Sequence, residues 1–432
     1  MNIAIIGAGY TGLSAGYYLT KKGHRVTIFE KDAYAGGLAQ GMKNSAETFP
    51  AEWDWDLEKF YHHWFTNDLY VKKLAKEIGT AHKFITKRPI SSILYDDDIF
   101  PFDSPLSLLT FPHIPLSDRI KTAVLIAKLK YLTSKEKSVA FENITAHDYL
   151  SKYSGAQAYQ KIWEPLLKGK FKQHAQIVSM RWFWARIFKR TPKLVYYEGG
   201  FSEFTRDLEK AFIEKGGKIL YGQSVEQIIQ TENGVTVLIA EQENKSFDKI
   251  IATTPPHIFA KQVTNLPDDY REKLLTNKGL SAYTLVLSLT HPLMQNTYWL
   301  SVNDESWPFL AVVEHTNFVD KKNYGNEHIV YIGDYVDQND PILSKSKDEI
   351  VDAFIPFLKK INPLVSRESV TRSFLFSVQY AQPIFTCGYQ QTIPSIQTPL
   401  SNILYANMSQ VYPWDRGTNY AIELGITCAN SI

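Results

Sequence analysis

Residues 2–30, which read NIAIIGAGYTGLSAGYYLTKKGHRVTIFE, determine how the N-terminal part of the chain folds. The apolar run 2–6 predicts a short buried β-strand, and residues 25–29 predict a second one. Residues 13–22 between them have helical character. This order predicts a βαβ unit, in which two parallel strands are joined by a helix.

The glycines after the first strand indicate what this unit binds. Gly7, Gly9 and Gly12 have G-x-G-x-x-G spacing, which permits a tight turn, close approach of a pyrophosphate to the backbone, and close packing of the helix. The start of the helix offers unpaired N–H groups and a positive dipole end to the phosphates. Glu30, at the end of the second strand, is placed to accept hydrogen bonds from ribose hydroxyls. These residues predict a dinucleotide site.

The composition sets outer limits. The chain has 432 residues, 44% of them hydrophobic, so it can bury a large core in two or three structural units. The only cysteines, Cys387 and Cys428, exclude a disulfide framework and a four-cysteine metal site, so we expect a cytoplasmic protein without a metal centre. We see no secretory signal before the first strand, and no uninterrupted apolar stretch is long enough to span a bilayer.

The charge is distributed unevenly. Residues 118–193 contain 16 Lys and Arg against 5 Asp and Glu, a net charge of +11, whereas the whole chain carries only +2. This basic segment is either a solvated helical face or a surface that attracts an anionic substrate or anionic lipid headgroups. The second interpretation places the protein at the inner face of the membrane. No zinc-finger spacing or other nucleic-acid-binding motif accompanies the basic residues, so we do not expect nucleic acid as a partner.

The residues after Glu30 suggest which dinucleotide is bound. The stretch 31–39 reads KDAYAGGLA, and its glycine pair, Gly36 and Gly37, resembles the extension found in FAD-binding members of the amine oxidase, protoporphyrinogen oxidase and phytoene desaturase superfamily, to which UDP-galactopyranose mutase is related. The resemblance implies non-covalent FAD as the cofactor, in preference to the alternative NAD, and Lys31 and Leu38 as further contacts.

Two later blocks resemble the same superfamily. Residues 196–237 and 247–259 resemble the part in which the residue at Val225 lends its backbone to the adenine. Residues 381–394 and 402–425 resemble the final strand, turn and helix, whose start at Gly417, Thr418 and Asn419 points at the flavin ring. Asn407 replaces the usual acidic residue there and implies a neutral contact to the ribityl-phosphate region. Neither cysteine occupies a position suited to covalent attachment of the flavin.

The resemblance implies an α/β fold with a Rossmann-like FAD-binding domain of the glutathione reductase type and an inserted α+β substrate domain. The FAD-binding domain is expected to be discontinuous and to comprise 1–65, 194–260 and 399–432. The substrate domain comprises 66–193, mainly helical, and 261–398, which also contains strands. Periodicity predicts amphipathic helices at 119–132 and 160–171, strands at 282–289 and 328–336, and a helix at 347–361.

The catalytic group is less evident. Residues 57–65 read LEKFYHHWF and fall where relatives run past the flavin with a Gly-x-His-x-Phe type of sequence, so His62 and His63 are the candidates for an acid or base at the ring. The alternative is a histidine with a purely structural role. The lysine that many amine oxidases place near the flavin is missing from 282–293, which makes a typical amine oxidation less suitable.

Cationic and aromatic side chains suggest how a substrate is held. Arg181 and Arg186 alternate with aromatic residues in RWFWARIFKR (181–190) and are candidates to pair with phosphate or carboxylate oxygens. Tyr380, Tyr389 and Trp414 lie in blocks expected near the flavin and are candidates for a flat, partly cationic pocket. The alternative for each aromatic residue is ordinary core packing.

Two classes of function fit these observations. The first, which we prefer, is an FAD-dependent oxidase or desaturase similar to protoporphyrinogen oxidase that takes hydride from an anionic or lipid-like substrate. The second is an isomerase resembling UDP-galactopyranose mutase, in which reduced flavin attacks a nucleotide sugar without net redox change. A non-enzymatic scaffold that merely retains FAD is a third.

Overall fold

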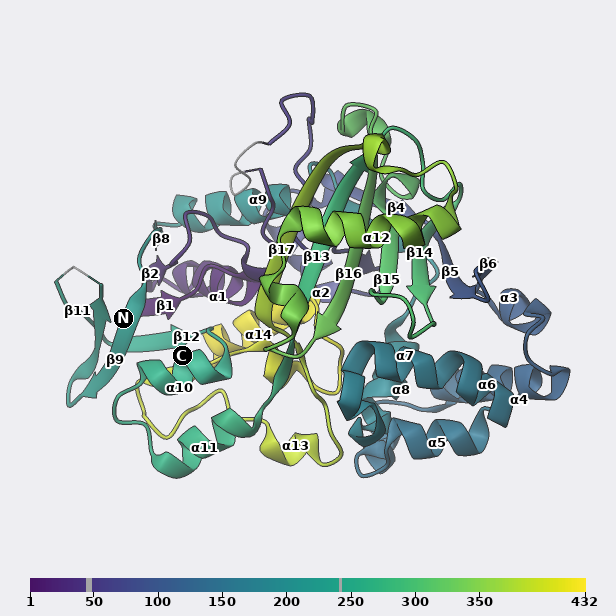
Figure 1. Ribbon diagram of the computed structural model, residues 1–432. Coiled ribbons are helices and arrows are strands. Elements are labelled where there is room, and N and C mark those ends of the chain that lie inside the picture. Colours follow the sequence, from purple (N-terminus) through teal and green to yellow (C-terminus); the bar gives the residue numbers. More distant parts are fainter. Residues whose placement is uncertain (44–48, 241–242) are drawn as a thin grey trace.

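The first strand lies at the centre of a five-stranded parallel sheet in the computed structural model, which describes residues 1–43, 49–240 and 243–432. Parallel sheets are covered on both faces, which explains why these strands are almost entirely apolar. Figure 1 shows that segments far apart in sequence meet in this sheet. Its strand order is β18 (Ile403–Tyr405), β12 (Lys249–Ala252), β1 (Asn2–Ile6), β2 (Arg25–Phe29) and β8 (Lys218–Leu220).

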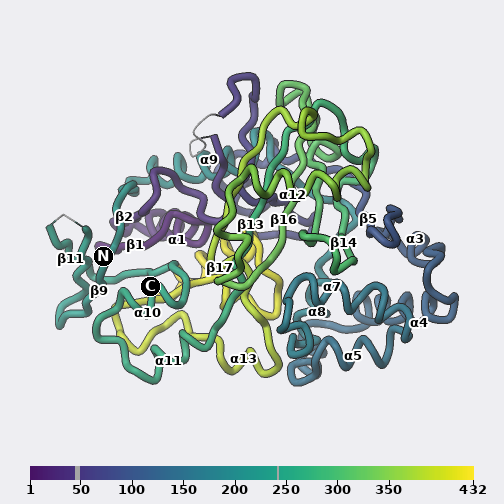
Figure 2. Tube along the Cα trace, viewed as in Figure 1, coloured from purple at the N-terminus to yellow at the C-terminus, as the bar shows by residue number. Residues whose placement is uncertain are grey.

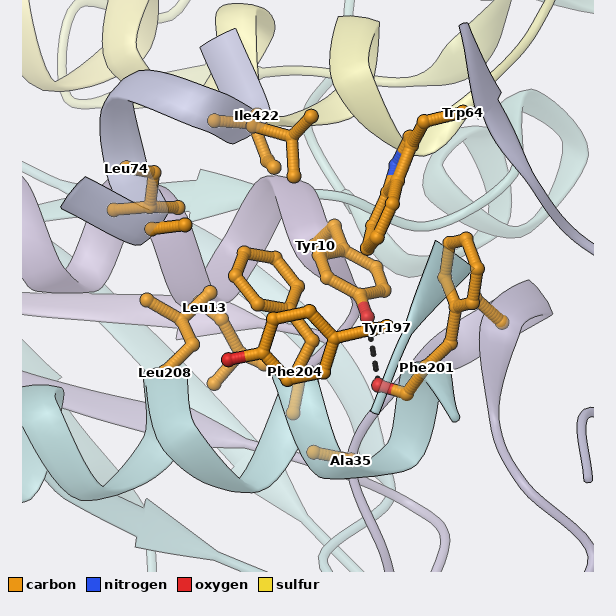
Figure 3. Packing of buried hydrophobic residues seen from close by; sticks show 14 of the residues in the cluster. Tyr10, Leu13, Ala35, Trp64, Leu74, Tyr197, Phe201, Phe204, Leu208 and Ile422 are labelled. Carbon is orange, nitrogen blue, oxygen red and sulfur yellow. Dashed lines mark hydrogen bonds between the residues drawn. The ribbon is translucent and has the colours of Figure 1, made fainter. Parts of the chain in front are cut away.

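The strand–helix–strand order expected at the N-terminus is confirmed, with β1 and β2 joined by α1 (Tyr10–Lys21). This helix packs against α9 (Phe201–Glu214) and α14 (Thr418–Asn430), and α2 (Leu69–Glu77) packs on α14. Figure 3 shows the resulting core, in which the Tyr10 hydroxyl donates a hydrogen bond to the Phe201 carbonyl at 3.0 Å.

A second, seven-stranded sheet lies beside the first. Helix α12 (Lys347–Ile361) packs on it and starts with a capping box formed by Ser346 and Glu349. The helix predicted at 347–361 and the strands predicted at 282–289 and 328–336 are confirmed. The strand order is β17 (Val370–Pro383), β13 (Gly279–Leu289), β16 (His328–Val336), β15 (Ala311–Glu314), β14 (Thr297–Val302), β5 (Ile90–Tyr95) and β6 (Asp98–Pro101).

A helical unit follows β6 in the sequence and lies at the opposite end of the molecule from β9 and β11 (Figure 2). Its core is aromatic and includes Trp163, Phe171, Trp182 and Trp184. The helices predicted at 119–132 and 160–171 are present, each extended by a wider helical turn, at 128–132 and 159–163. The unit contains α3 (Pro105–Thr110), α4 (Leu116–Ala127), α5 (Ala146–Tyr153), α6 (Ala156–Ala158), α7 (Glu164–Phe171) and α8 (Met180–Lys189).

Smaller elements join these units. The remaining strands form two three-stranded sheets: β3 (Trp64–Phe65), β7 (Leu194–Tyr197) and β4 (Phe84–Lys87), and β11 (Lys245–Phe247), β10 (Gly234–Ile239) and β9 (Val225–Thr231). The remaining α-helices are α10 (Pro256–Gln262), α11 (Asp268–Thr276) and α13 (Tyr389–Thr392). Because α2 packs on α14 and β4 pairs with β7, both elements contact the parallel-sheet unit, and the domain boundary at residue 65 stays a prediction.

Within the described residues, no helix combines the length and the apolar character needed to cross a bilayer.

Candidate active site

A cavity of about 260 Å³ lies where the three units meet. One wall is the segment 60–65, and another is the start of α14 with the residues just before it, 415–420. The end of α8 contributes Ala185, Arg186 and Lys189, and Arg190 follows directly after the helix. Strands of the seven-stranded sheet close the remaining side. The cavity therefore brings together His62, His63 and Arg186 with the C-terminal block, although these parts are distant in sequence.

Near this cavity, the glycine-rich turn of β1 meets the glycine pair. The Gly36 N–H donates to the Ala8 carbonyl at 3.0 Å, and Gly9 and Gly36 form an isolated parallel bridge. A Cβ on Gly37, whose φ is +58°, would lie 3.2 Å from the Gly9 Cα. Gly9 is the residue directly before α1, and no side chain of the described residues caps the helix there. The backbone N–H groups at the helix start therefore face a surface almost free of side chains. This cradle and its donors fit a pyrophosphate.

The close packing expected of Gly12 is also present. A Cβ there would lie 2.0 Å from the Gly7 carbonyl oxygen, so any larger residue would separate the helix from the strand. Glu30 is buried, and its carboxylate accepts hydrogen bonds from the Ala8 N–H at 2.7 Å and the Asp32 N–H at 3.0 Å. Burial raises the pKa of Glu30. Because only these two N–H groups of the described residues donate to it, the carboxylate keeps further lone pairs that can accept hydrogen bonds from ribose hydroxyls.

The remaining residues that we predicted to contact FAD lie in separate parts of the structure. Val225 is the first residue of β9, and its carbonyl accepts a hydrogen bond from the Gln262 side chain at 2.8 Å. Leu38 lines the cavity, whereas Lys31 is exposed outside it. The Asn407 amide donates to the Thr254 carbonyl at 3.1 Å and accepts from the Ser409 N–H at 3.1 Å, so it already caps the turn that follows.

The start of α14 is the second helix terminus that fits an electron-rich ligand. Gly417, Thr418 and Asn419 line the cavity, and no side chain of the described residues caps the helix at Gly417. The Thr418 hydroxyl accepts a hydrogen bond from the Trp64 indole at 2.5 Å, which fixes the helix start against the histidine segment. The positive end of the helix dipole therefore points into the cavity.

His62 and His63 both line the cavity. The His62 Nδ1 lies 2.5 Å from the Phe60 carbonyl, so Nδ1 carries the proton and Nε2 is left as an acceptor. The His63 Nδ1 lies 3.4 Å from the Tyr298 hydroxyl. Burial lowers the pKa of His62 to about 4 and the pKa of His63 to about 3, so both imidazoles are neutral near pH 7.

In the wall of the cavity, two cationic side chains share one carboxylate. Asp415 accepts ion pairs from Lys170 at 3.3 Å and from Arg186 at 3.1 Å, and a hydrogen bond from the Trp182 indole at 3.2 Å. Burial lowers the pKa of Lys170 to about 7, although Asp415 opposes this shift. Arg186 therefore lines the cavity but already has a carboxylate partner.

Arg190 also lines the cavity and was not identified from the sequence. Across 1–43, 49–240 and 243–432, its guanidinium makes no ion pair or side-chain hydrogen bond. The Arg190 side chain is exposed to solvent, and partial desolvation by the surrounding atoms, with the nearby Arg186 as a second cause, lowers its pKa only to about 10, so it stays charged at pH 7. The spacing of four residues from Arg186 could have revealed it, because residues four apart lie on the same face of a helix.

Four other predicted substrate residues do not line the cavity. Arg181 forms a buried ion pair with Glu142 at 3.2 Å, because a buried guanidinium needs a carboxylate and one is available inside the helical unit. Tyr380 and Tyr389 are buried, and the Tyr389 hydroxyl donates to the Ser409 carbonyl at 3.1 Å. Trp414 stacks on Tyr420 and lies under the Lys189 ammonium. Each of these four has a packing or pairing partner in the protein, and their role as substrate contacts stays a prediction.

Comparisons with known proteins agree with this geometry. Coproporphyrinogen III oxidase of Staphylococcus aureus is 22% identical over 335 residues, which are 69% of each chain. An oxidoreductase from Methanosarcina mazei matches with a TM-score of 0.75, 18% identity and complete coverage of both chains. Reduced UDP-galactopyranose mutase matches with a TM-score of 0.75 and 14% identity over 99% of this chain and 94% of that one. At these identities, the two structures show a shared α/β fold.

The family comparison is more specific. The model of the family described as "Flavin containing amine oxidoreductase" matches residues 10–432, which is nearly the whole chain. The expected superfamily is thereby confirmed, with FAD as the cofactor. The chain belongs to the flavin-containing amine oxidoreductase family and is an FAD-dependent oxidoreductase.

Proposed function

We propose that this enzyme is an oxidase or desaturase of the protoporphyrinogen oxidase type, which takes hydride from an anionic or lipid-like substrate in the central cavity. The observation that carries the proposal is Arg190, an exposed, charged guanidinium without a carboxylate partner in the described residues, which lines the same cavity as His62 and the start of α14. Such a group is compensated best by a carboxylate or phosphate of the ligand.

We further propose that FAD is held non-covalently by a Rossmann-like domain of the glutathione reductase type. Its pyrophosphate would lie at Gly7, Gly9 and the start of α1, its ribose at Glu30, and its adenine at the backbone of Val225. Gly36 and Gly37 would pass close to it, and Leu38, Asn407 and the start of α14 would hold the ribityl chain and the ring. In support, neither Cys387 nor Cys428 is among the residues that line the cavity.

When bound, FAD supplies an acceptor for the hydride that an oxidation removes from a C–H bond. The chain's own residues bind and orient the substrate. Arg190 holds its anionic group. Trp299 packs edge-on against Tyr61, with 4.8 Å between the ring centroids, and offers an apolar wall for a ring or hydrocarbon of the substrate. The unprotonated Nε2 of His62 can accept a hydrogen bond from the substrate, or the proton that is lost when a double bond forms.

The proposal is tested by anaerobic mixing of the purified yellow protein with coproporphyrinogen III. Substrate oxidation would bleach the absorbance of the oxidised flavin in a single turnover without an added acceptor. Arg190→Ala is expected to weaken binding, whereas the wild type and the variant keep equal flavin content. Flavin that remains with the acid-precipitated protein would contradict the non-covalent mode.

A second candidate is a nucleotide-sugar mutase, because a diphosphate would also compensate Arg190 and the fold matches reduced UDP-galactopyranose mutase. Activity on UDP-galactopyranose that appears only after dithionite reduction would favour this candidate, and flavin bleaching by a porphyrinogen would favour the first.

A further inference from the structure

Helix α4 buries one face against the protein and leaves an apolar stripe uncovered. Its inner face buries Asp118, Thr122 and Leu125 and continues to Leu129 in the helical turn 128–132. The outer face repeats every four residues, and large aliphatic side chains lie in solvent there: Leu116 is 59% exposed, Ile120 50% and Val124 63%. Burial of one face against the core is the usual arrangement of a surface helix, so the second apolar stripe requires another explanation.

Neighbouring residues extend this stripe into a surface. Leu106 of α3 is 71% exposed, and Tyr131 and Leu132, which follow α4, are 79% and 69% exposed. The Arg119 side chain donates to the Leu109 carbonyl at 2.8 Å and to the Ile114 carbonyl at 2.8 Å, which fastens α4 to α3. In Figure 1, α3 and α4 lie at the outer edge of the molecule. We call Leu106, Leu116, Ile120, Val124, Tyr131 and Leu132 the outer apolar face.

The charges around the outer apolar face are mostly positive. Between residues 116 and 139, the exposed charged side chains are Lys121, Lys128, Lys135 and Lys137 against the single acid Glu136. Other basic residues of 118–193 serve internal contacts, such as the ion pairs of Arg181, Lys172 and Lys170. The basic surplus of the segment is therefore divided between the interior and this surface.

The outer apolar face is also connected to the cavity. Lys130, in the helical turn 128–132, donates to the carbonyls of Ile187 and Phe188 at 3.3 Å each and also to the Arg190 carbonyl. These carbonyls belong to the end of α8, whose residues line the cavity. The surface and the cavity wall are thus joined by one side chain.

We propose that the protein docks on an anionic lipid bilayer through the outer apolar face. The aliphatic and tyrosine side chains would enter the interface between headgroups and acyl chains, while the four exposed lysines contact anionic headgroups. A second copy of this chain fits less well, because a two-fold interface would bring the same lysines face to face. The proposal concerns the surface alone and is independent of which substrate the cavity binds.

The test is sedimentation of the FAD-loaded protein with vesicles of phosphatidylcholine and phosphatidylglycerol, and with vesicles of phosphatidylcholine alone. We expect binding to the anionic vesicles that weakens with salt, because the lysine contacts are screened. The double variant Ile120→Glu, Val124→Glu should reduce the partition coefficient by at least about tenfold, since it places two charges in the interface. The matched control is Leu364→Glu, at a residue that is 73% exposed but outside the outer apolar face, and it should bind like the wild type.

Flavin content and melting temperature, measured in both variants, show whether the fold is intact. Absence of binding to anionic vesicles at low salt would overturn the proposal. So would equal binding of the double variant and the wild type, because apolar insertion would then play no part. A dimer in sedimentation velocity that is lost in the double variant would identify the face as an interface between copies and would overturn the lipid assignment. Bleaching of the flavin by a water-soluble substrate is a separate readout, so failure here leaves the proposed oxidation untouched.

Discussion

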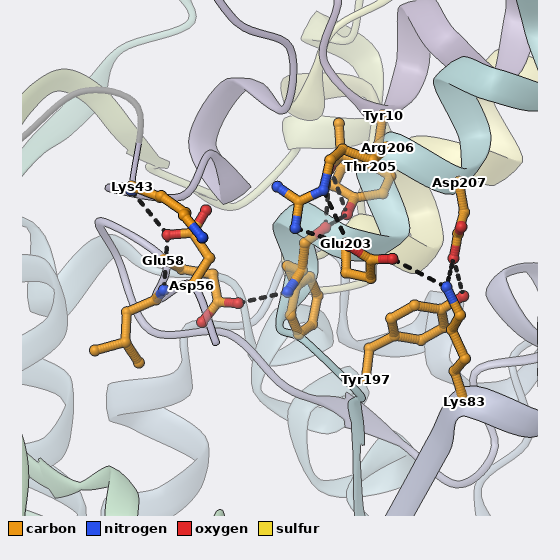
Figure 4. Close-up of polar contacts among 12 residues, drawn as sticks. Tyr10, Lys43, Asp56, Glu58, Lys83, Tyr197, Glu203, Thr205, Arg206 and Asp207 are labelled. Carbon is orange, nitrogen blue, oxygen red and sulfur yellow. Dashed lines mark hydrogen bonds and ion pairs between the residues drawn. The ribbon is translucent and has the colours of Figure 1, made fainter. Parts of the chain in front are cut away.

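Replacing Glu58 with glutamine should change how stability depends on pH. Glu58, labelled in Figure 4, is buried, and its carboxylate accepts hydrogen bonds from the Phe201 N–H at 2.6 Å and from the Tyr196 hydroxyl at 2.9 Å. Its own carbonyl accepts from the Tyr331 hydroxyl at 2.9 Å. Glu58 thereby ties the segment that leads to His62 to the start of α9. Burial raises its pKa from 4.5 to about 8.

The direction in which stability changes with pH follows from proton linkage. Because the folded pKa is raised, the folded protein binds more protons than the unfolded chain between pH 4.5 and pH 8, so the wild type loses stability as the pH rises through this range. At about 1.4 kcal/mol per unit, the loss from this group is about 3.5 kcal/mol between pH 5 and pH 8. Glutamine resembles the protonated acid and does not titrate, so Glu58→Gln avoids this loss.

The assay is the melting temperature of the FAD-loaded wild type and variant from pH 5 to pH 8. With an unfolding entropy of about 0.9 kcal/mol/K for a chain of this length, the variant should gain about 4 °C relative to the wild type across the range. The exposed Glu226→Gln is the control and should follow the wild type. A difference between Glu58→Gln and wild type that stays constant with pH would refute the reasoning, because it would mean that Glu58 is ionised in the folded protein throughout.

Three further variants test the site. Gly37→Val should abolish FAD retention, because the new side chain would meet the Gly9 backbone. The control Gly79→Val should keep the flavin, because Gly79 has a similar positive φ of 79° but open space around it. Equal flavin content in the two variants would show that the cradle is misplaced. Arg190→Ala should raise the dissociation constant of an anionic substrate by about 10-fold to 100-fold, the size expected for a charge-assisted hydrogen bond, and unchanged binding in a titration would remove Arg190 from the pocket. The rate of flavin reduction should show no histidine inflection between pH 6 and pH 8, because the lowered pKa keeps His62 neutral there; an inflection near pH 6.5 that His62→Gln abolishes would contradict this.

The parts of the fold that could be predicted depend on local signals. The glycine spacing after β1 and the apolar runs of β1 and β2 predict the strand–helix–strand unit, because turn geometry and periodicity are properties of neighbouring residues. The helix starts at Tyr10, three residues before the predicted helical stretch, since Gly9 already begins it. Strands β5 and β6 were not expected in the segment 66–193, because their pairing with β14 depends on a partner about 200 residues away.

The site could be predicted only in part, for a related reason. Arg181, Arg186 and Arg190 look alike in the sequence, but which of them is free depends on where Glu142 and Asp415 fold. Glu142 compensates Arg181 and Asp415 compensates Arg186, so of these three arginines only Arg190 has no carboxylate partner among the described residues. A motif predicts where a cofactor binds because backbone geometry repeats within a family, whereas charge pairing is decided by long-range packing.

The same distinction applies to α4. Periodicity predicts a helix at 119–132 and one apolar face that packs on the core, and Thr122, Leu125 and Leu129 meet that expectation. It does not show whether the second stripe, with Ile120 and Val124, is covered. In the structure, this stripe faces outward beside exposed lysines, whereas the arginines of α8 turn inward to carboxylates and the cavity. A single basic segment therefore serves two different environments, and the vesicle assay and the Arg190 variant examine them separately.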